Sequence, residues 1–530
     1  MTVKTTKSLV LVLVVLPILC AAQTSTVSHD WLTWGGGPDR FGWAKSESIL
    51  SKDNVSKMQL KWMAQLDNPS SDVIFSAVTA PLVAENIATA QGRKTLIYVA
   101  GSGDIVYALD EASGAVVWEK KFPNTLRPRQ NASVSCPNTQ NATPVIDKVA
   151  GIIYVLTSDG KLRGLSLTDG SDRMPATDFV TPFVRDWSLN LIDGVIFTTF
   201  GRGCGGAQGS QGIPPAEMAA MDVRDPAHPR KKFNTSTGRP NGAWGRGGTT
   251  LGPRGIYVMT ADGPFDPSKN LFGESFMIFN PKTLEVVDYY TPKNWEYLNE
   301  KDLDLGAASP LVFNFKNWEL VAGIAKEGVM YLLDGKSLGG ADHQTPLFVS
   351  PRFANDEVLL YGRGVWGGMA TWEDSEGQRW LYVPIWGPPT KPLPRFKTIW
   401  GMQESGSIMA FQLGVENEKP SLVPMWISES MSVPDPPVVA NGVVFSVSTG
   451  ENPRQGGVGG RDRERAQFVG TASLRAFDAV TGKQLYHSGS IVDDWTHYSG
   501  LAVANGRVYF TTTHSRVYSF GLPNAAAGAR

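Results

Sequence analysis

One short strand pattern recurs along this chain and constrains its fold more than any other feature. The clearest copy is the alternating strand 105–110, which is followed by Ser113-Gly114 and a second apolar strand at 116–118. Residues 474–486 repeat the same order near the other end of the sequence. An apolar strand, an Asp that caps its own turn and a glycine free to take positive φ together predict a β-hairpin.

Each hairpin follows an opening strand that is rich in β-branched and aromatic residues. From Tyr98 to Tyr509 the chain advances 411 residues in seven intervals, about 59 residues each. That length accommodates four strands with their loops and predicts an all-β, eight-bladed β-propeller. The opening strands centre on Tyr98, Tyr154, Phe197, Tyr257, Val321, Tyr382, Phe445 and Tyr509.

The two ends of the repeat array complement each other. Strand 517–520 has no partner strand after it, whereas Leu60-Lys61-Trp62 resembles the strands that finish each repeat. We therefore expect the N-terminal strand to complete the last blade, which hides the exposed edges of an open array. Helical periodicity is weak, with its best candidate at 51–58, so residues 23–530 are predicted to form one propeller domain.

The first 22 residues have the composition of a secretory signal peptide. Lys4 and Lys7 precede an apolar run at 9–16, and Cys20-Ala21-Ala22 offers a small-residue cleavage site. This segment predicts a periplasmic or secreted protein. A lipid anchor on Cys20 is the alternative, which the large Leu19 before it disfavours. No later segment is long and apolar enough for a transmembrane helix.

Charge and cysteine content narrow the function classes. After the leader, 47 Lys and Arg residues face 50 Asp and Glu residues, with no basic stripe, so nucleic acid is not an expected partner. Export leaves Cys136 and Cys204, which predicts one disulfide between neighbouring blades; two separate buried thiols are the alternative.

These motifs resemble the eight-bladed quinoprotein alcohol dehydrogenases, the pyrroloquinoline-quinone (PQQ) propellers. Trp34-Gly35, residues 39–41 and Leu60-Lys61-Trp62 are similar to the start of that family, and the Ala-Leu-Asp-x-x-Ser/Thr-Gly-x-x-x-Trp repeat to its blade motif. The likeness spans nearly the whole chain after the leader. It implies the quinoprotein alcohol dehydrogenase-like fold, and PQQ with Ca²⁺ as cofactors.

The resemblance also assigns roles to individual residues. Asp262 stands where the family has an Asn that ligates calcium, and Asp304 matches the catalytic base, with Asp302 second. Lys326 matches the basic residue that contacts the quinone oxygens. Trp244 and Arg246, in a Gly-rich run, are the remaining cofactor-binding candidates. From the residues alone, Asp262 also suits a turn cap, and Asp302 and Asp304 a solvated surface.

Several features of the family are missing from this chain. It has no adjacent cysteine pair and no Cys-x-x-Cys-His haem motif, so electrons would need an external acceptor. Residues 198–204 contain no carboxylate where the family places a calcium-ligating Glu. Trp244 stands earlier than the family's stacking Trp.

Two functions follow as alternatives. The first is an exported quinone-dependent dehydrogenase that oxidises a small-molecule alcohol or polyol. The second is a non-catalytic propeller that binds protein or glycan partners, as outer-membrane assembly propellers of this repeat type do. A hydrolase that uses Asp302 and Asp304 has no supporting partner residues.

Overall fold

The structure is a computed structural model of the chain. It describes residues 1–3, 28–69, 78–133, 136–139, 141–201, 204–212, 214–235, 242–356, 358, 363–452 and 469–524. Most of the expected signal peptide lies outside these residues.

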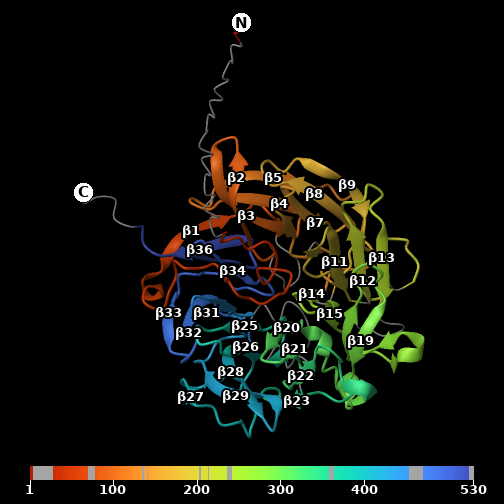
Figure 1. The fold of residues 1–530 in the computed structure, drawn as a ribbon, viewed down its shortest axis with the longest axis vertical. Coiled ribbons are helices and arrows are strands. Elements are labelled where there is room, and N and C mark those ends of the chain that lie inside the picture. Colours follow the sequence, from red (N-terminus) through yellow and green to blue (C-terminus); the bar gives the residue numbers. More distant parts are fainter. Residues whose placement is uncertain are drawn as a thin grey trace.

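Eight sheets, antiparallel except for one parallel edge strand in blade 6, stand around a central axis and form the blades of a propeller (Figure 1). The first four blades follow one another along the chain. Blade 1 contains β2 (Leu82–Thr89), β3 (Gly92–Gly101), β4 (Ile105–Asp110) and β5 (Val116–Lys121); blade 2 contains β6 (Val145–Asp147), β7 (Ile152–Leu156), β8 (Lys161–Ser166) and β9 (Asp172–Asp178); blade 3 contains β10 (Asn190–Ile192), β11 (Val195–Phe200), β12 (Glu217–Asp222) and β13 (Arg230–Asn234); blade 4 contains β14 (Thr250–Gly252), β15 (Gly255–Met259), β18 (Phe276–Phe279) and β19 (Val286–Tyr290).

The other four blades complete the ring. Blade 5 contains β20 (Leu311–Phe315), β21 (Trp318–Ile324), β22 (Met330–Asp334) and β23 (Phe348–Val349); blade 6 contains β24 (Gly364–Val365), β25 (Ala370–Glu373), β26 (Arg379–Trp386), β28 (Gly406–Glu416), β29 (Lys419–Ile427) and β27 (Thr398–Ile399); blade 7 contains β30 (Val438–Ala440), β31 (Val443–Ser448), β32 (Ser473–Asp478) and β33 (Gln484–His487); blade 8 contains β34 (Leu501–Ala504), β35 (Arg507–Thr511), β36 (Arg516–Gly521) and β1 (Gln59–Gln65).

The predicted eight-bladed propeller is confirmed, and each predicted opening strand is the second strand of its blade. Four of the innermost strands, β6, β10, β14 and β30, are only three residues long. They carry too few residues for a periodic pattern, which explains why the sequence did not reveal them.

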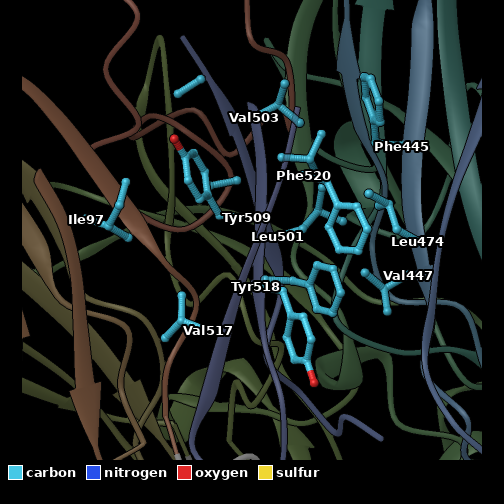
Figure 2. Packing of buried hydrophobic residues seen from close by; sticks show 14 of the residues in the cluster. Ile97, Phe445, Val447, Leu474, Leu501, Val503, Tyr509, Val517, Tyr518 and Phe520 are labelled. Atoms are coloured by element: carbon cyan, nitrogen blue, oxygen red, sulfur yellow. The ribbon is translucent and has the colours of Figure 1, made fainter. Parts of the chain in front are cut away.

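The predicted ring closure is also confirmed. Strand β1 pairs with β36 in an antiparallel register from Gln59 opposite Gly521 to Gln65 opposite Arg516. Behind this pair, Tyr509, Tyr518 and Phe520 of blade 8 pack with apolar side chains of blades 1 and 7 (Figure 2). The pairing therefore joins the two ends of the repeat array through main-chain hydrogen bonds and a shared apolar core.

The Gly and Trp of the repeat motif meet between neighbouring blades. Trp118 of blade 1 lies against Gly170 of blade 2, and its indole N–H donates to the Leu167 carbonyl at 3.0 Å. The ring occupies the space that a side chain at Gly170 would need. Trp62 contacts Gly114 in the same way across the closing blade. The motif thus specifies contacts between blades as well as the hairpin.

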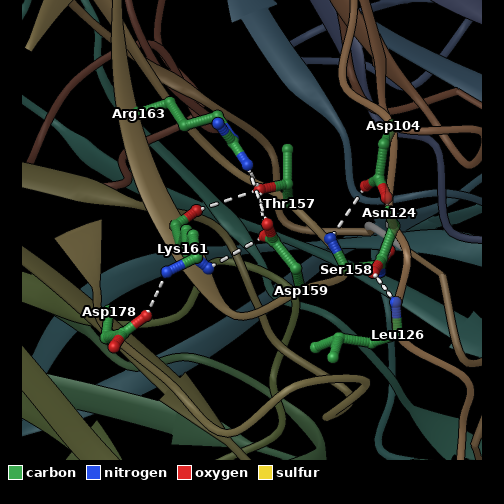
Figure 3. Close-up of polar contacts among 9 residues, drawn as sticks. All are labelled: Asp104, Asn124, Leu126, Thr157, Ser158, Asp159, Lys161, Arg163 and Asp178. Carbon is green, nitrogen blue, oxygen red and sulfur yellow. Dashed lines mark hydrogen bonds and ion pairs between the residues drawn. The ribbon is translucent and has the colours of Figure 1, made fainter. Parts of the chain in front are cut away.

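A polar contact joins the loops of blades 1 and 2 (Figure 3). Asp104, in the turn between β3 and β4, accepts hydrogen bonds from the Ser158 backbone N–H at 2.8 Å and from its hydroxyl. Asp104 is buried, with 6% of its surface exposed. Both Ser158 groups are therefore satisfied by a carboxylate that has little contact with water.

The segment before β1 crosses the ring near its axis. Its backbone bonds to innermost strands of blades 1, 2, 4, 6 and 7, for example at Val83, Ile146 and Leu251. Arg40 in this segment is fully buried and donates to the carbonyls of Trp34, Leu189 and Thr249. Burial lowers the pKa of Arg40 to about 9.

Short helices and one two-stranded sheet complete the fold. The 3₁₀ helix η1 (Val55–Lys57) falls within the expected helical stretch, whereas α1 (Trp295–Lys301) was not predicted. The other 3₁₀ turns are η2 (Pro267–Lys269), η3 (Leu305–Ala307) and η4 (Gly340–Asp342), and β16 (Phe265–Asp266) pairs with β17 (Leu271–Phe272). No helix of the described residues is long and apolar enough to cross a membrane.

The predicted disulfide is present. Cys136 and Cys204 are bonded across 68 residues of sequence. The bond joins the segment between blades 1 and 2 to the loop between β11 and β12 of blade 3, so it reaches one blade further than the predicted link between neighbours.

Candidate functional site

The candidate residues gather at one end of the propeller axis because of strand direction. In each blade the innermost strand runs antiparallel to the second, so the residues before the first and after the second lie at the same end. Trp244 and Asp304 precede innermost strands β14 and β20, whereas Asp262 and Lys326 follow second strands β15 and β21.

Three carboxylates form a cluster between blades 4 and 5. One oxygen each of Asp262, Glu274 and Asp304 lies within 4.8 Å of the other two. Asp304 accepts the Asp262 backbone N–H at 3.1 Å, and Glu274 accepts the Leu305 N–H at 2.7 Å. Loop backbone therefore holds the acids together against their mutual repulsion. We call Asp262, Glu274 and Asp304 the carboxylate cluster.

Lys326 is the cation that faces this cluster. Its Nζ donates to Asp304, and to the side chain of Asp302 at 2.7 Å. Its side chain is 4% exposed. The Nζ also lies 5.1 Å from the ring of Trp244 and 5.0 Å from that of Trp366. Lys326 thus connects the acids to a group of aromatic rings.

Burial and neighbouring charges separate the pKa values of the four acids. Burial, and then Asp304, raises the pKa of Asp262 to about 8 and moves that of Glu274 well above its usual range. The same two causes raise the pKa of Asp302 to about 6. Burial opposes ionisation of Asp304 too, but the Lys326 ammonium holds its pKa below the ordinary value. Asp304 is therefore ionised while Asp262 and Glu274 retain protons at neutral pH.

Five aromatic rings surround the axis next to Lys326. Trp366 stacks on Trp386 with 5.0 Å between ring centroids, and its edge meets Trp244 at 5.2 Å. Tyr498 contacts Trp386 and Trp187 at 6.2 and 6.3 Å. The rings come from blades 3, 4, 6 and 8 or the segments that precede them. We call Trp187, Trp244, Trp366, Trp386 and Tyr498 the aromatic cluster.

Two guanidinium groups approach the aromatic cluster. The Cζ of Arg246 lies 4.8 Å from the Tyr498 ring centroid, and that of Arg185 lies 5.8 Å from the same centroid. Arg246 is 4% exposed and bonds through Nη2 to Asp435. The second Asp435 oxygen accepts the Gly500 N–H at 2.8 Å.

The structure brings together the residues that the resemblance singled out. Asp262, Asp304, Asp302 and Lys326 share one site, and Trp244 lies over Lys326. Arg246 is further along the axis, beside Tyr498. Their assigned roles stay predictions.

The sequence did not reveal Glu274. Residues 198–204 lack the expected acid, but Glu274, in the same loop as Asp262, supplies a third carboxylate. Glu274 takes positive φ, at 48°, which is uncommon for a Glu and which only the folded chain reveals. Trp366 was also missed, because it lies where residues 366–369 interrupt the innermost strand of blade 6.

The donor set of the carboxylate cluster fits a hard cation. Asp262 Oδ1 and Glu274 Oε1 are buried without a hydrogen-bond partner. Buried carboxylate oxygens without partners are costly, and an oxygen-preferring cation such as Ca²⁺ would satisfy them. The adjacent rings and the Lys326 ammonium suit a planar molecule with carbonyl oxygens.

The fold is an eight-bladed propeller of the PQQ-like type, and it is similar to solved structures of quinoprotein alcohol dehydrogenases. The quinohemoprotein alcohol dehydrogenase ADHIIG from Pseudomonas putida HK5 is 14% identical, with a TM-score of 0.57 over 95% of this chain and 82% of the other. The quinohemoprotein alcohol dehydrogenase from Comamonas testosteroni is 15% identical, with a TM-score of 0.57 over 96% of this chain and 83% of the other. At these identities the likeness concerns the fold.

Sequence comparison adds one family. Residues 59–182 match the model of the family described as outer membrane protein assembly factor BamB. This match spans β1 and the first two blades. No curated protein matches the sequence.

Proposed function

We propose that this protein is an exported quinone-dependent dehydrogenase, with Ca²⁺ in the carboxylate cluster and PQQ beside Lys326 and the aromatic cluster. The observation that carries this proposal is the pair of buried, unpartnered oxygens on Asp262 and Glu274 next to ionised Asp304. A purely structural acid cluster gains nothing from orphaned oxygens, whereas a cation site needs them.

The residues of the chain would divide the work of alcohol oxidation. Asp262 and Glu274 would hold the cation, after losing the protons that they retain in its absence. Asp304, ionised and fixed by Lys326, would accept the hydroxyl proton of an alcohol. Lys326 would donate to the quinone oxygens and favour negative charge on them. The quinone itself supplies the capacity to accept a hydride.

The direct test is cation binding by calorimetry at pH 7. We expect saturable Ca²⁺ binding with proton release, because the pKa of Asp262 is raised to about 8 and must be overcome. Asp262→Asn and Glu274→Gln should each weaken binding by at least about tenfold, since each removes a charged ligand. Asp266→Asn, an acid of the same loop outside the carboxylate cluster, is the control and should leave affinity unchanged.

Turnover is tested after reconstitution with Ca²⁺ and PQQ, using dye-linked oxidation of alcohols. Asp304→Asn should abolish turnover and leave quinone affinity largely intact. Unchanged turnover in this variant would remove Asp304 from the mechanism, and absence of saturable quinone binding to the unaltered protein would refute the dehydrogenase proposal.

The second candidate is a scaffold that binds protein partners without a cofactor. The match of residues 59–182 to the BamB family favours it. It predicts that Asp262→Asn and Glu274→Gln raise stability, because these acids stay protonated in the fold and ionise on unfolding. It also predicts that Ca²⁺ does not stabilise the unaltered protein.

A further inference from the structure

A cavity lies between blades 6 and 7, at the end of the propeller opposite the carboxylate cluster. Its lining includes the turn that connects β25 to β26 and the turn that connects β30 to β31, and its volume is about 590 Å³. Such turns join the innermost strand of a blade to the second strand, whereas Asp262 and Asp304 lie at the other ends of the corresponding strands. The cavity is therefore separate from the proposed dehydrogenase site. Its volume is within the roughly 300–1,000 Å³ of small-molecule sites.

One side of the cavity is a row of side chains on a single face of blade 6. Trp380 of β26 pairs with Trp372 of β25 and with Gln412 of β28. Residues directly opposite each other in antiparallel strands place their side chains on the same face of a sheet. Trp380 is buried, and Trp372, whose ring centroid is 6.5 Å from that of Trp380, is half-buried like Gln412. This face thus presents an indole ring and a side-chain amide on either side of Trp380.

Asp374 fixes the turn that follows Trp372. One of its carboxylate oxygens accepts the backbone N–H groups of Glu376 at 3.0 Å and Gln378 at 2.8 Å. The other oxygen accepts the indole N–H of Trp380 at 2.9 Å. The turn and the row of side chains are therefore held together by one carboxylate.

Trp43, from the segment before β1, also lines the cavity and is half-buried. The residues on either side of it bond to the backbone of β30. The Ala44 N–H donates to the Val439 carbonyl at 2.8 Å, and the Val439 N–H donates to the Gly42 carbonyl at 2.7 Å. Trp43 and Trp372 therefore stand on backbone that is fixed before a ligand arrives, which lowers the conformational cost of binding.

The charged groups of the lining disfavour an anionic ligand. They are four acids and two lysines: Glu47, Glu373, Asp374, Glu376, Lys45 and Lys52. Both lysines already have a carboxylate partner, Asp39 at 3.3 Å for one and Asp478 at 3.5 Å for the other, and Arg379 offsets Glu373. Acids still outnumber cations, so the cavity repels phosphate and carboxylate groups.

The uncharged groups of the lining suit a ligand that is rich in hydroxyl groups. The Gln412 amide and the Trp372 indole N–H make no hydrogen bond with the described residues, so both are available to a ligand. A sugar hydroxyl both donates and accepts hydrogen bonds, and the C–H face of a pyranose ring packs on an indole ring. A lipid chain or an apolar peptide would need aliphatic surface, and Val480 is the only aliphatic residue among the described residues of the lining.

A smaller cavity of about 180 Å³ adjoins the first. The two share Trp43, Lys45 and Glu47, and the smaller one extends to Trp31 and to Ala504 at the end of β34. Two cavities with a common wall at Trp43 accommodate a chain of sugar units better than a single unit.

We propose that these adjoining cavities bind an uncharged oligosaccharide, with sugar rings against Trp43 and Trp372 and hydroxyl groups bonded to Gln412. The inference goes beyond the proposed dehydrogenase function and does not depend on it. Binding at this end leaves the carboxylate cluster accessible while the protein is attached to a glycan.

The experiment is isothermal titration calorimetry of the protein with uncharged hexasaccharides. The probes are maltohexaose, cellohexaose, laminarihexaose, xylohexaose, mannohexaose and chitohexaose. We expect at least one to bind saturably, and about tenfold more tightly than its monosaccharide, because only the chain reaches both tryptophans. Hexagalacturonate, which has the same length and a carboxylate on each unit, should bind at least about tenfold more weakly than that hexasaccharide.

Two variants locate the binding site. Trp372→Ala should weaken the binding of the hexasaccharide about tenfold, through loss of one aromatic contact. Gln412→Leu, which removes the amide and keeps a side chain of similar size, should weaken it about three- to tenfold and carries the test if Trp372→Ala does not fold. The matched control is Trp318→Ala, at a half-buried tryptophan of β21 outside both cavities, which should keep full affinity. Asp304→Asn, at the other end of the propeller, should keep it too.

Several outcomes would overturn the inference. One is the absence of saturable binding by every hexasaccharide, and another is binding that Trp372→Ala and Gln412→Leu both leave unchanged. Preferred binding of hexagalacturonate or of a proline-rich peptide would assign the cavity to an anionic or a peptide ligand instead. Loss of Ca²⁺ or quinone binding changes none of these readouts, so failure of the dehydrogenase proposal and failure of this inference are distinguishable.

Discussion

At the scale of single residues, a neighbouring cation decides which buried acids of this protein carry charge. Asp104 and Asp304 are buried to a similar degree, at 6% and 5% exposed. Asp304 has the Lys326 ammonium bonded to it and stays ionised, whereas Asp104 accepts hydrogen bonds from the two Ser158 groups and has Arg163 only as a weaker opposing charge. Burial raises the pKa of Asp104 to about 6 despite these hydrogen bonds. A nearby cation, more than hydrogen bonding, therefore determines ionisation in this interior.

Asp104 gives a pH dependence of stability that can be measured. Its folded pKa of about 6 exceeds the ordinary 3.8, so the folded protein binds more protons between these values. The free energy of unfolding should fall as pH rises through that window, by on the order of 2–3 kcal/mol. Asp104→Asn should remove this part of the slope in urea unfolding between pH 4 and pH 7. The control Asp172→Asn, at an exposed acid of blade 2, should keep the same dependence of stability on pH. An unchanged slope in Asp104→Asn would contradict the attribution of this dependence to Asp104.

At the scale of strands and turns, the contact between Trp and Gly links one blade to the next. Gly170 and Gly151 both have φ of +70°, but only Gly170 faces a ring, with Trp118 Cε3 at 2.7 Å from an added Cβ. At Gly151 nothing lies within 4 Å. The two glycines thus separate the backbone cost of a side chain from its packing cost.

Alanine at the two positions should have unequal effects. Gly151→Ala should cost about 1–2 kcal/mol for a left-handed backbone with a Cβ. Gly170→Ala should cost a further 1–3 kcal/mol or so, because the Trp118 ring must move. Urea denaturation of both variants gives the difference directly, and equal losses would show that the contact is dispensable.

The repeated hairpins could be predicted from the sequence, whereas the shortest strands and helix α1 could not. Hairpins containing Tyr98 or Phe445 alternate over enough residues to show a period, and they are the second and third strands of their blades. Four innermost strands, β6, β10, β14 and β30, have only three residues, too few to show a period. Helix α1 has only seven residues, too few to show a helical period, and its N-cap Asn294 makes no side-chain capping hydrogen bond.

The candidate site was predictable in part for a related reason. Asp262, Asp304 and Lys326 follow or precede regular strands, and their order along the chain pointed to a common site. Glu274 and Trp366 depend on irregular backbone, a positive φ and a broken strand, which only the folded chain reveals.

At the scale of the whole molecule, the ring depends on strands from both ends of the array. Removing residues 501–530 would leave β1 without a partner and expose the apolar faces of blades 1 and 7. We expect this truncated chain to aggregate and to be cut rapidly by protease. Removing residues 525–530 alone keeps every strand of blade 8 and should leave a protein of unchanged size in solution and unchanged protease resistance. Size-exclusion chromatography and limited proteolysis distinguish the two, and a monomeric, resistant 1–500 chain would contradict the role of closure.

The pairing of β1 with β36 also has a consequence for biosynthesis. The ribosome makes β1 first and its partner about 450 residues later, so the earliest strand must wait for the last one. No intermediate length can complete the final blade, and a chain released early keeps an open edge that proteases and chaperones recognise. The final blade can therefore form only after the ribosome has made the chain through β36.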